Sequence, residues 1–150
     1  MVAFIATAFV QHSFAQDNLK ESQLLRLYYN IKDALVAGNA NTASSNAEEF
    51  ATTLNGIDEK TIPEVSRDAL LKGAGKISST KDIKLQREQF ADFSANMIAV
   101  AKAVKLTTQP VYAAYCPMKK AYWLSSEKAI KNPYYGNAML TCGKVTETLQ

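Results

Sequence analysis

Histidine is almost missing from this 150-residue chain, since the single one is His12, near the start. Histidine is the side chain that most often performs acid–base catalysis near neutral pH. The sequence also lacks a glycine-rich phosphate loop and a motif of paired carboxylates, and its two cysteines stand 26 positions apart instead of forming a Cys-x-x-Cys redox pair. These absences predict a protein without enzymatic activity.

An excess of one charge and long apolar runs are absent too. The chain has 17 Lys and Arg against 14 Asp and Glu, a formal net charge of +3, and no basic run of the kind that nucleic-acid-binding proteins carry. After the first residues, no apolar segment approaches the roughly 20 residues that span a bilayer as a helix. We therefore expect no nucleic-acid partner and no membrane span in the mature chain.

The first residues are typical of a secretory signal peptide. An apolar run extends from Val2 to Val10, and Ser13-Phe14-Ala15 places small residues at both outer positions of a cleavage site. No Lys or Arg precedes the run, and the alternative is a buried N-terminal helix. We expect cleavage after Ala15, with residues 16–150 exported to the periplasm or another compartment outside the cytoplasm as one domain.

Four helices are predicted from apolar residues that recur every three or four positions. Thr61 to Glu64 reads as a capping box that starts the third helix. Gly73 and Gly75 lie inside that helix, where glycine is unfavourable, and therefore indicate either a kink or close packing of another element, of which we favour close packing. Short links between helices favour antiparallel neighbours, so the expected fold is mainly α, an antiparallel four-helix bundle. The predicted helices cover about residues 18–37, 41–54, 61–78 and 80–105.

The pattern changes in residues 110–149, the C-terminal lobe. Pro110 to Cys116 and Leu140 to Leu149 are rich in strand-forming residues and are predicted to pair as two strands. Between them, Leu124 to Ile130 resembles one or two helical turns begun by a serine cap. The lobe is thus expected to be small, two-stranded and rich in loops.

Both cysteines and two of the four methionines lie in this lobe, as Cys116, Met118, Met139 and Cys142. If the two predicted strands pair, the four sulfurs converge. Thiolates and thioethers are soft donors that suit Cu(I), whereas Zn(II) seldom accepts a thioether. This interpretation predicts a Cu(I) site made of these four side chains.

A disulfide between Cys116 and Cys142 is the alternative, because two cysteines in an exported protein usually form one. It would close a loop of about 27 residues and stabilise the fold by about 3–4 kcal/mol. The protein would then be a non-catalytic interaction domain that contacts a partner through tyrosines. Exposed tyrosines favour this alternative, and tyrosines buried around the sulfurs favour the metal site; the four in question are Tyr112, Tyr122, Tyr134 and Tyr135.

Five strings of residues resemble a known family. They are Gln86 to Ser94 (QREQFADFS), Tyr115 to Met118 (YCPM), Trp123 to Ser125 (WLS), Ile130 to Gly136 (IKNPYYG) and Met139 to Val145 (MLTCGKV). Together they resemble domain-of-unknown-function family 3347, whose exported bacterial members occur alone or at the C-terminus of periplasmic adaptor subunits of heavy-metal efflux systems. The resemblance implies a helical periplasmic domain linked to copper handling, with an efflux adaptor or another periplasmic protein as its partner.

The second string, Tyr115 to Met118, also resembles the start of a heavy-metal-binding motif that continues with His-Pro. Here Lys119-Lys120 follow instead, and residues 16–150 contain no histidine, so sulfur is the remaining soft donor and Zn(II), Ni(II) and Cu(II) are poor candidates. Pro117 would fix the backbone beside the first cysteine, and Tyr115 or Trp123 would shield the site. The other supporting residues expected around the sulfurs are Asn132, Pro133, Tyr134, Gly136 and Gly143.

Overall fold

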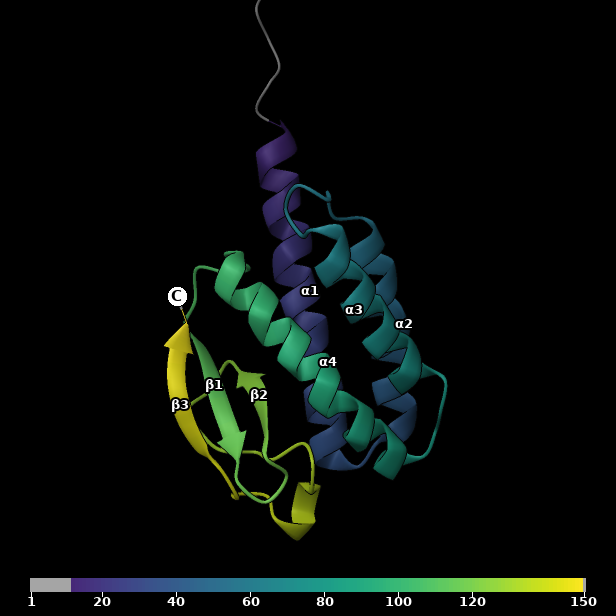
Figure 1. Ribbon diagram of the computed structural model, residues 1–150, viewed down its shortest axis with the longest axis vertical. Helices are drawn as coiled ribbons and strands as arrows, with labels where there is room; N and C mark the ends of the chain where they lie inside the picture. The colour runs from purple at the N-terminus through teal and green to yellow at the C-terminus, as the bar shows by residue number, and fades with distance from the viewer. Residues whose placement is uncertain (1–11, 150) are drawn as a thin grey trace, which may run out of the picture.

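A computed structural model describes residues 12–149 of the protein, with side chains from Leu19 onward. Within that range, four α-helices precede a small antiparallel sheet of three strands (Figure 1). The mainly helical fold is therefore confirmed, whereas the prediction of a two-stranded lobe is wrong. The arrangement of the helices as an antiparallel four-helix bundle stays a prediction. The predicted signal peptide, residues 1–15, falls mostly outside the described residues.

The helices overlap the four predicted ranges, and two of them begin later than expected. The predicted capping box is not formed: the Thr61 N–H donates to the Asp58 carbonyl at 3.0 Å, and the residue before α3 is Pro63, which makes no side-chain cap. Before α4, Asp82 accepts a hydrogen bond from the Lys84 N–H at 2.8 Å, so Asp82 satisfies an unpaired first-turn amide. The helices are α1 (His12–Ala37), α2 (Ala40–Asn55), α3 (Glu64–Ser78) and α4 (Ile83–Ala103).

Aromatic rings from three helices form the centre of the core. Tyr28 stacks on Phe90 with ring centroids 5.5 Å apart, and Phe50 meets Phe93 edge-on at 4.9 Å. All four are fully buried, and such ring pairs stabilise beyond the area they bury. The predicted apolar stripes therefore do face one another.

The two glycines of α3 differ in their surroundings. A Cβ at Gly73 would lie 2.9 Å from Cδ2 of Phe93, too close for any side chain, so this glycine lets α3 approach α4. A Cβ at Gly75 would have nothing within 4 Å. The prediction of close packing is correct for Gly73 and wrong for Gly75.

The strands are β1 (Val111–Cys116), β2 (Ala121–Ser125) and β3 (Lys144–Leu149), in the order β2-β1-β3 with both pairs antiparallel. The predicted pairing of the first strand with the last is confirmed. The helical turns predicted from Leu124 onward are wrong, because β2 occupies the start of that segment. A tight turn joins β1 to β2: the Lys120 N–H donates to the Cys116 carbonyl at 2.8 Å, and Lys120 has a left-handed φ of 56°.

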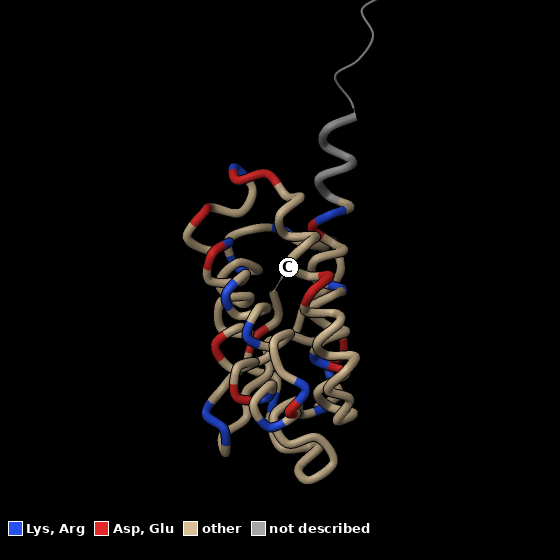
Figure 2. Tube along the Cα trace, turned by 90° about the vertical axis from the view of Figure 1, so that its right-hand side faces the viewer, with Lys and Arg blue, Asp and Glu red and all other residues tan. Residues whose placement is uncertain are grey.

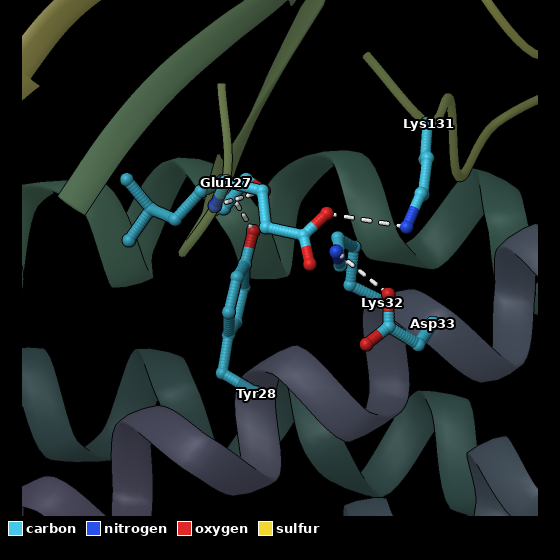
Figure 3. A network of polar contacts seen from close by, with 7 residues as sticks. Tyr28, Lys32, Asp33, Glu127 and Lys131 are labelled. Carbon is cyan, nitrogen blue, oxygen red and sulfur yellow. Dashed lines mark hydrogen bonds and ion pairs between the residues drawn. The ribbon is translucent and has the colours of Figure 1, made fainter. Parts of the chain in front are cut away.

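One tyrosine hydroxyl connects the helices to the sheet. Tyr28 rises from α1 (Figure 3), and its hydroxyl accepts a hydrogen bond from the Leu124 N–H of β2 at 3.0 Å and lies 2.6 Å from Ser94 Oγ of α4. Burial raises the pKa of Tyr28, so the hydroxyl stays protonated. In Figure 1, α4 runs obliquely between α3 and the sheet. The buried contacts of the Tyr28 hydroxyl with Leu124 and Ser94 fix where β2 lies on α4.

The charged residues show no segregation by sign in the view of Figure 2, where Lys and Arg alternate with Asp and Glu along the helices. The loop at the lower end of that view contains no charged residue, in agreement with the sequence Gly136 to Thr141. Among the helices in the described part of the chain, none is both long and apolar enough to cross a membrane.

Candidate thiol site

The two cysteines, called the thiol pair below, lie side by side. Cys116 is the last residue of β1, and Cys142 precedes β3, whose first residue Lys144 pairs with Tyr115. This antiparallel register makes Cys116 and Cys142 neighbours across the β1–β3 pairing, close enough for each thiol to affect the ionisation of the other. Both cysteines are free. The structure therefore contains two adjacent thiols and not the disulfide that was the alternative prediction.

The members of the pair differ in exposure. Cys116 is fully buried, whereas Cys142 is partly exposed in the loop. Backbone N–H groups of the turn after β1 face both sulfurs: the Lys119 N–H donates to Cys116 Sγ at 3.4 Å, and the Met118 N–H reaches Cys142. Because an N–H donor stabilises a negatively charged acceptor, this turn can support a thiolate at either position.

The pKa of the Cys142 thiol is raised above its ordinary value. Loss of contact with water is the largest cause, repulsion from Cys116 and the hydrogen bond between the thiols add to it, and the Met118 N–H acts in the opposite direction. Two neighbouring thiolates disfavour each other's charge. Losing both protons therefore becomes favourable when a cation binds between the two sulfurs.

The two methionines of the predicted site flank the thiol pair through their backbones. Met118 lies in the turn after β1, and its side chain is 63% exposed. Met139 is half-buried and follows the short 3-10 helix η1 (Gly136–Ala138), and its carbonyl accepts a hydrogen bond from the Cys142 N–H at 3.1 Å. Among the described residues, no group of three or more His, Cys, Asp or Glu side chains is placed to hold a metal ion.

The loop that carries Cys142 is organised by Asn132, which is fully buried. Its Nδ2 donates to the Cys142 carbonyl at 2.7 Å, and its Oδ1 accepts from the N–H groups of Tyr134 and Tyr135 at 2.8 and 3.2 Å. Its own N–H donates to the Leu140 carbonyl at 2.8 Å. One side chain thus holds both ends of the loop, and the position of Cys142 depends on it.

Tyr134 and Trp123 form the wall behind the thiol pair. The Tyr134 hydroxyl donates to the Tyr122 carbonyl, and its ring meets Phe90 at 5.8 Å and Trp123 at 6.2 Å between centroids. Burial raises the pKa of Tyr134, which therefore remains a hydrogen-bond donor. Gly143 has a φ of 141°, and a Cβ there would lie 2.7 Å from Cη2 of Trp123, so glycine is required beside this ring.

Of the remaining supporting residues, Gly136 has a left-handed φ of 54° and lies against Arg87 and the end of α1. Arg87 donates from Nη2 to the Leu35 carbonyl at 2.6 Å, so this arginine connects α4, α1 and the loop. Pro133 is buried, whereas Pro117 is exposed in the turn. The loop therefore contacts the helices at Gly136, where Arg87 and the end of α1 lie close.

Some of the tyrosines fit the expected metal site, and others fit the expected interaction surface. Tyr134 is buried beside the thiol pair, whereas Tyr122 is 46% exposed and packs on Tyr115 with ring centroids 4.6 Å apart. Tyr112 and Tyr135 are half-buried. Tyr122 also lines a groove of about 350 Å³ between α4 and the sheet. Tyrosine exposure alone therefore does not separate a metal site from an interaction surface.

Three contacts around the site do not follow from the sequence. Tyr28 is expected as a core ring, yet its hydroxyl bonds the Leu124 N–H of β2, 96 positions away. The other two are the hydrogen bond from the Lys119 N–H to Cys116 Sγ and the one from the Arg87 guanidinium to the Leu35 carbonyl. A backbone donor or a contact between distant elements leaves no periodic pattern in the sequence. For Lys119, the tight turn after Cys116 is the one indication that the sequence offers.

The family model described as "Protein of unknown function (DUF3347)" matches residues 24–109, more than half of the chain. No curated protein and no solved structure shows significant similarity to the chain. The matched range contains the string Gln86 to Ser94 and ends before β1. The match thus covers the helices that support the thiol site but not the two cysteines themselves.

Proposed function

The chain belongs to the DUF3347 family of proteins of unknown function, and we propose that it is an exported, non-enzymatic domain that binds or relays Cu(I) through the sulfurs of Cys116 and Cys142. The proposal extends to a role in heavy-metal efflux or resistance, with an efflux adaptor or another periplasmic protein as the partner that supplies or receives the ion.

The observation that carries this proposal is the pair of adjacent free thiols. Thiolate is the donor that Cu(I) prefers, and a bound cation removes the repulsion that otherwise keeps the second thiol protonated. The N–H groups of Met118 and Lys119 face the sulfurs and would stabilise the negative charge left on a complex of one Cu(I) with two thiolates.

Met118 and Met139 would act as auxiliary donors. Each follows or precedes a cysteine closely in the sequence, and the exposed side chain of Met118 is free to rotate. A thioether is neutral and weaker than a thiolate, so we expect it to adjust affinity and to assist transfer to a partner. The thiol pair remains the main binding group.

Titration with Cu(I) under reducing conditions, against a competing chelator, tests the proposal. Replacing either Cys116 or Cys142 with serine should remove most of the affinity, because a charged soft donor is lost. Replacing Met118 or Met139 with leucine should weaken binding by a smaller factor and leave the fold intact. Met97→Leu, in the core of α4, is the matched methionine control and should have no effect on binding.

Equal copper affinities for the wild-type protein and both cysteine variants would refute the metal proposal. The exposed Tyr122, the exposed Met118 and the groove beside α4 would then favour the second candidate, a non-catalytic interaction domain stabilised by a Cys116–Cys142 disulfide formed after export. In that case a Tyr122→Ser variant should lose partner binding while its thermal stability remains unchanged.

A further inference from the structure

The thiol pair is chemically asymmetric. Cys116 lies at the end of β1 with no exposed surface, and Cys142 lies partly exposed in the loop before β3. A reagent in solution can therefore reach Cys142 in the native state, whereas reaching Cys116 requires local opening of the lobe. The two cysteines are nevertheless neighbours across the pairing of β1 with β3, where Tyr115 pairs with Lys144, and the thiols interact. Cys142 can thus react with an external reagent, and Cys116 can then react with the modified Cys142.

We propose that Cys142 is a site of thiol–disulfide exchange with small disulfides from solution, and that Cys116 is the resolving thiol that closes a reversible Cys116–Cys142 disulfide. This assignment differs from a permanent structural bridge, because both the free and the bridged states are native states of the lobe. It also gives the two cysteines separate roles that their spacing in the sequence does not reveal.

The reaction has two displacement steps. The Cys142 thiolate attacks one sulfur of an external disulfide, a mixed disulfide forms, and the first external thiolate leaves and takes up the proton released by Cys142. The Cys116 thiolate then attacks Sγ of Cys142, the internal disulfide forms, and the second external thiolate leaves with the proton from Cys116. The pair loses two electrons, and the external disulfide is reduced to two thiols.

The turn after β1 supports each step. The Met118 N–H faces the sulfur of Cys142, which must be a thiolate in the first step. The Lys119 N–H donates to Cys116 Sγ at 3.4 Å, and Cys116 must be the thiolate in the second. Asn132 holds the loop through the Cys142 carbonyl, so the mixed disulfide forms beside Cys116 instead of swinging into solvent.

The consequence for copper rests on the proposed function above. A disulfide has no thiolate to offer, so the bridged state would not hold Cu(I), whereas the reduced state would. Exchange at Cys142 would therefore release the ion, and reduction of the bridge would restore the site. Binding would follow the redox state of the surrounding thiols.

Oxidised glutathione is the probe for the exchange reaction. The reduced wild-type protein is mixed with it in the absence of metal, samples are quenched with acid over time, and intact mass and peptide mapping locate the glutathione. We expect the first adduct on Cys142, followed by its loss as the internal disulfide forms. Cys116→Ser should stop at a stable adduct on Cys142. Cys142→Ser should react at Cys116 at least about tenfold more slowly until denaturant is added.

Two results would overturn the assignment: an adduct that appears first on Cys116 in the wild-type protein, or a wild-type adduct on Cys142 that persists without an internal disulfide. Circular dichroism checks that each variant is folded, and Cys116→Ala replaces Cys116→Ser if the buried hydroxyl disrupts the lobe. Because peptide mapping of the wild-type protein gives the order directly, the proposal can be tested even if both variants unfold.

A separate copper titration of the reduced and the bridged protein distinguishes this inference from the proposed function. Ordered exchange together with Cu(I) binding by the reduced form alone supports both. Ordered exchange without Cu(I) binding by the reduced form refutes the proposed function and leaves the exchange site standing. Cu(I) binding without ordered exchange refutes the exchange site and leaves the proposed function standing.

Discussion

Helix α4 and the loop of residues 126–143 both pack against the sheet, yet they owe their positions to different features. In α4, regular backbone hydrogen bonds and a stripe of buried side chains hold the helix in place, so many residues contribute to its position. In the loop, η1 is the one regular element among the described residues, and Asn132 and two left-handed glycines determine the path. Order is distributed in α4 and concentrated in the loop, so substitutions should act globally in α4 and locally in the loop.

Phe90→Ala should have the largest effect on stability, because Phe90 belongs to the distributed core and also contacts the loop. Its fully buried ring lies between Tyr28 and Tyr134. Removing it should lower the free energy of unfolding by about 3–5 kcal/mol through lost burial and a residual cavity. Chemical denaturation followed by circular dichroism measures this change.

Leu85→Ala is the matched control, on the same helix at a position that is 47% exposed. It should change stability by less than about 1 kcal/mol. If Phe90→Ala destabilised the protein no more than Leu85→Ala does, Phe90 would not be a core residue and the contrast between α4 and the loop would be wrong.

The same contrast explains which parts of the fold are predictable from the sequence. Helical apolar stripes repeat, so the spacing of residues such as Leu24, Phe50 and Phe93 correctly predicts the buried faces of the helices. Strand β2 is missed because Ser125 resembles a helix cap, and a strand of five residues offers little alternation to detect. The Tyr122-Trp123-Leu124 run of strand formers is the pattern that points to the correct structure.

The candidate site is only partly predictable for a related reason. Pairing of the first and last strands follows from composition, and it brings Cys116 and Cys142 together. Which cysteine is buried, and which N–H groups face the sulfurs, depends on a turn and a loop whose conformations no repeating pattern encodes. Asn132 is expected as a supporting residue from family resemblance, and its five hydrogen bonds can be assigned only from the structure.

Asn132→Ala tests the concentrated order of the loop. It removes the bond to the Cys142 carbonyl and leaves the buried N–H of Tyr134 and the partly buried N–H of Tyr135 without their acceptor, which should lower the free energy of unfolding by about 1–3 kcal/mol. Cys116 should also become reactive toward a thiol reagent in the native state, because the loop that covers it loosens. Thermal melting and the rate of thiol labelling measure the two effects.

Asn137→Ala is the control in the same loop, at an exposed position of η1. It should leave both stability and the labelling rate of Cys116 unchanged. Were both asparagine variants to label at the wild-type rate, the loop would not depend on Asn132, and its order would have to be as distributed as that of α4.

The smallest effect is expected at the surface, where α4 meets strand β3 of the sheet. Lys102 of α4 and Glu147 of β3 form an ion pair with N–O distance 2.7 Å, and both side chains are about half exposed, at 49% and 47%. Water and salt screen such a pair, so a double-mutant cycle with Lys102→Ala and Glu147→Ala should give a coupling energy of about 0–1 kcal/mol that declines as salt is added. A salt-insensitive coupling above about 2 kcal/mol would contradict this prediction. The helices and the sheet would then be held together by surface charge, and not by the buried contact between Tyr28 and Leu124 that the structure places at their junction.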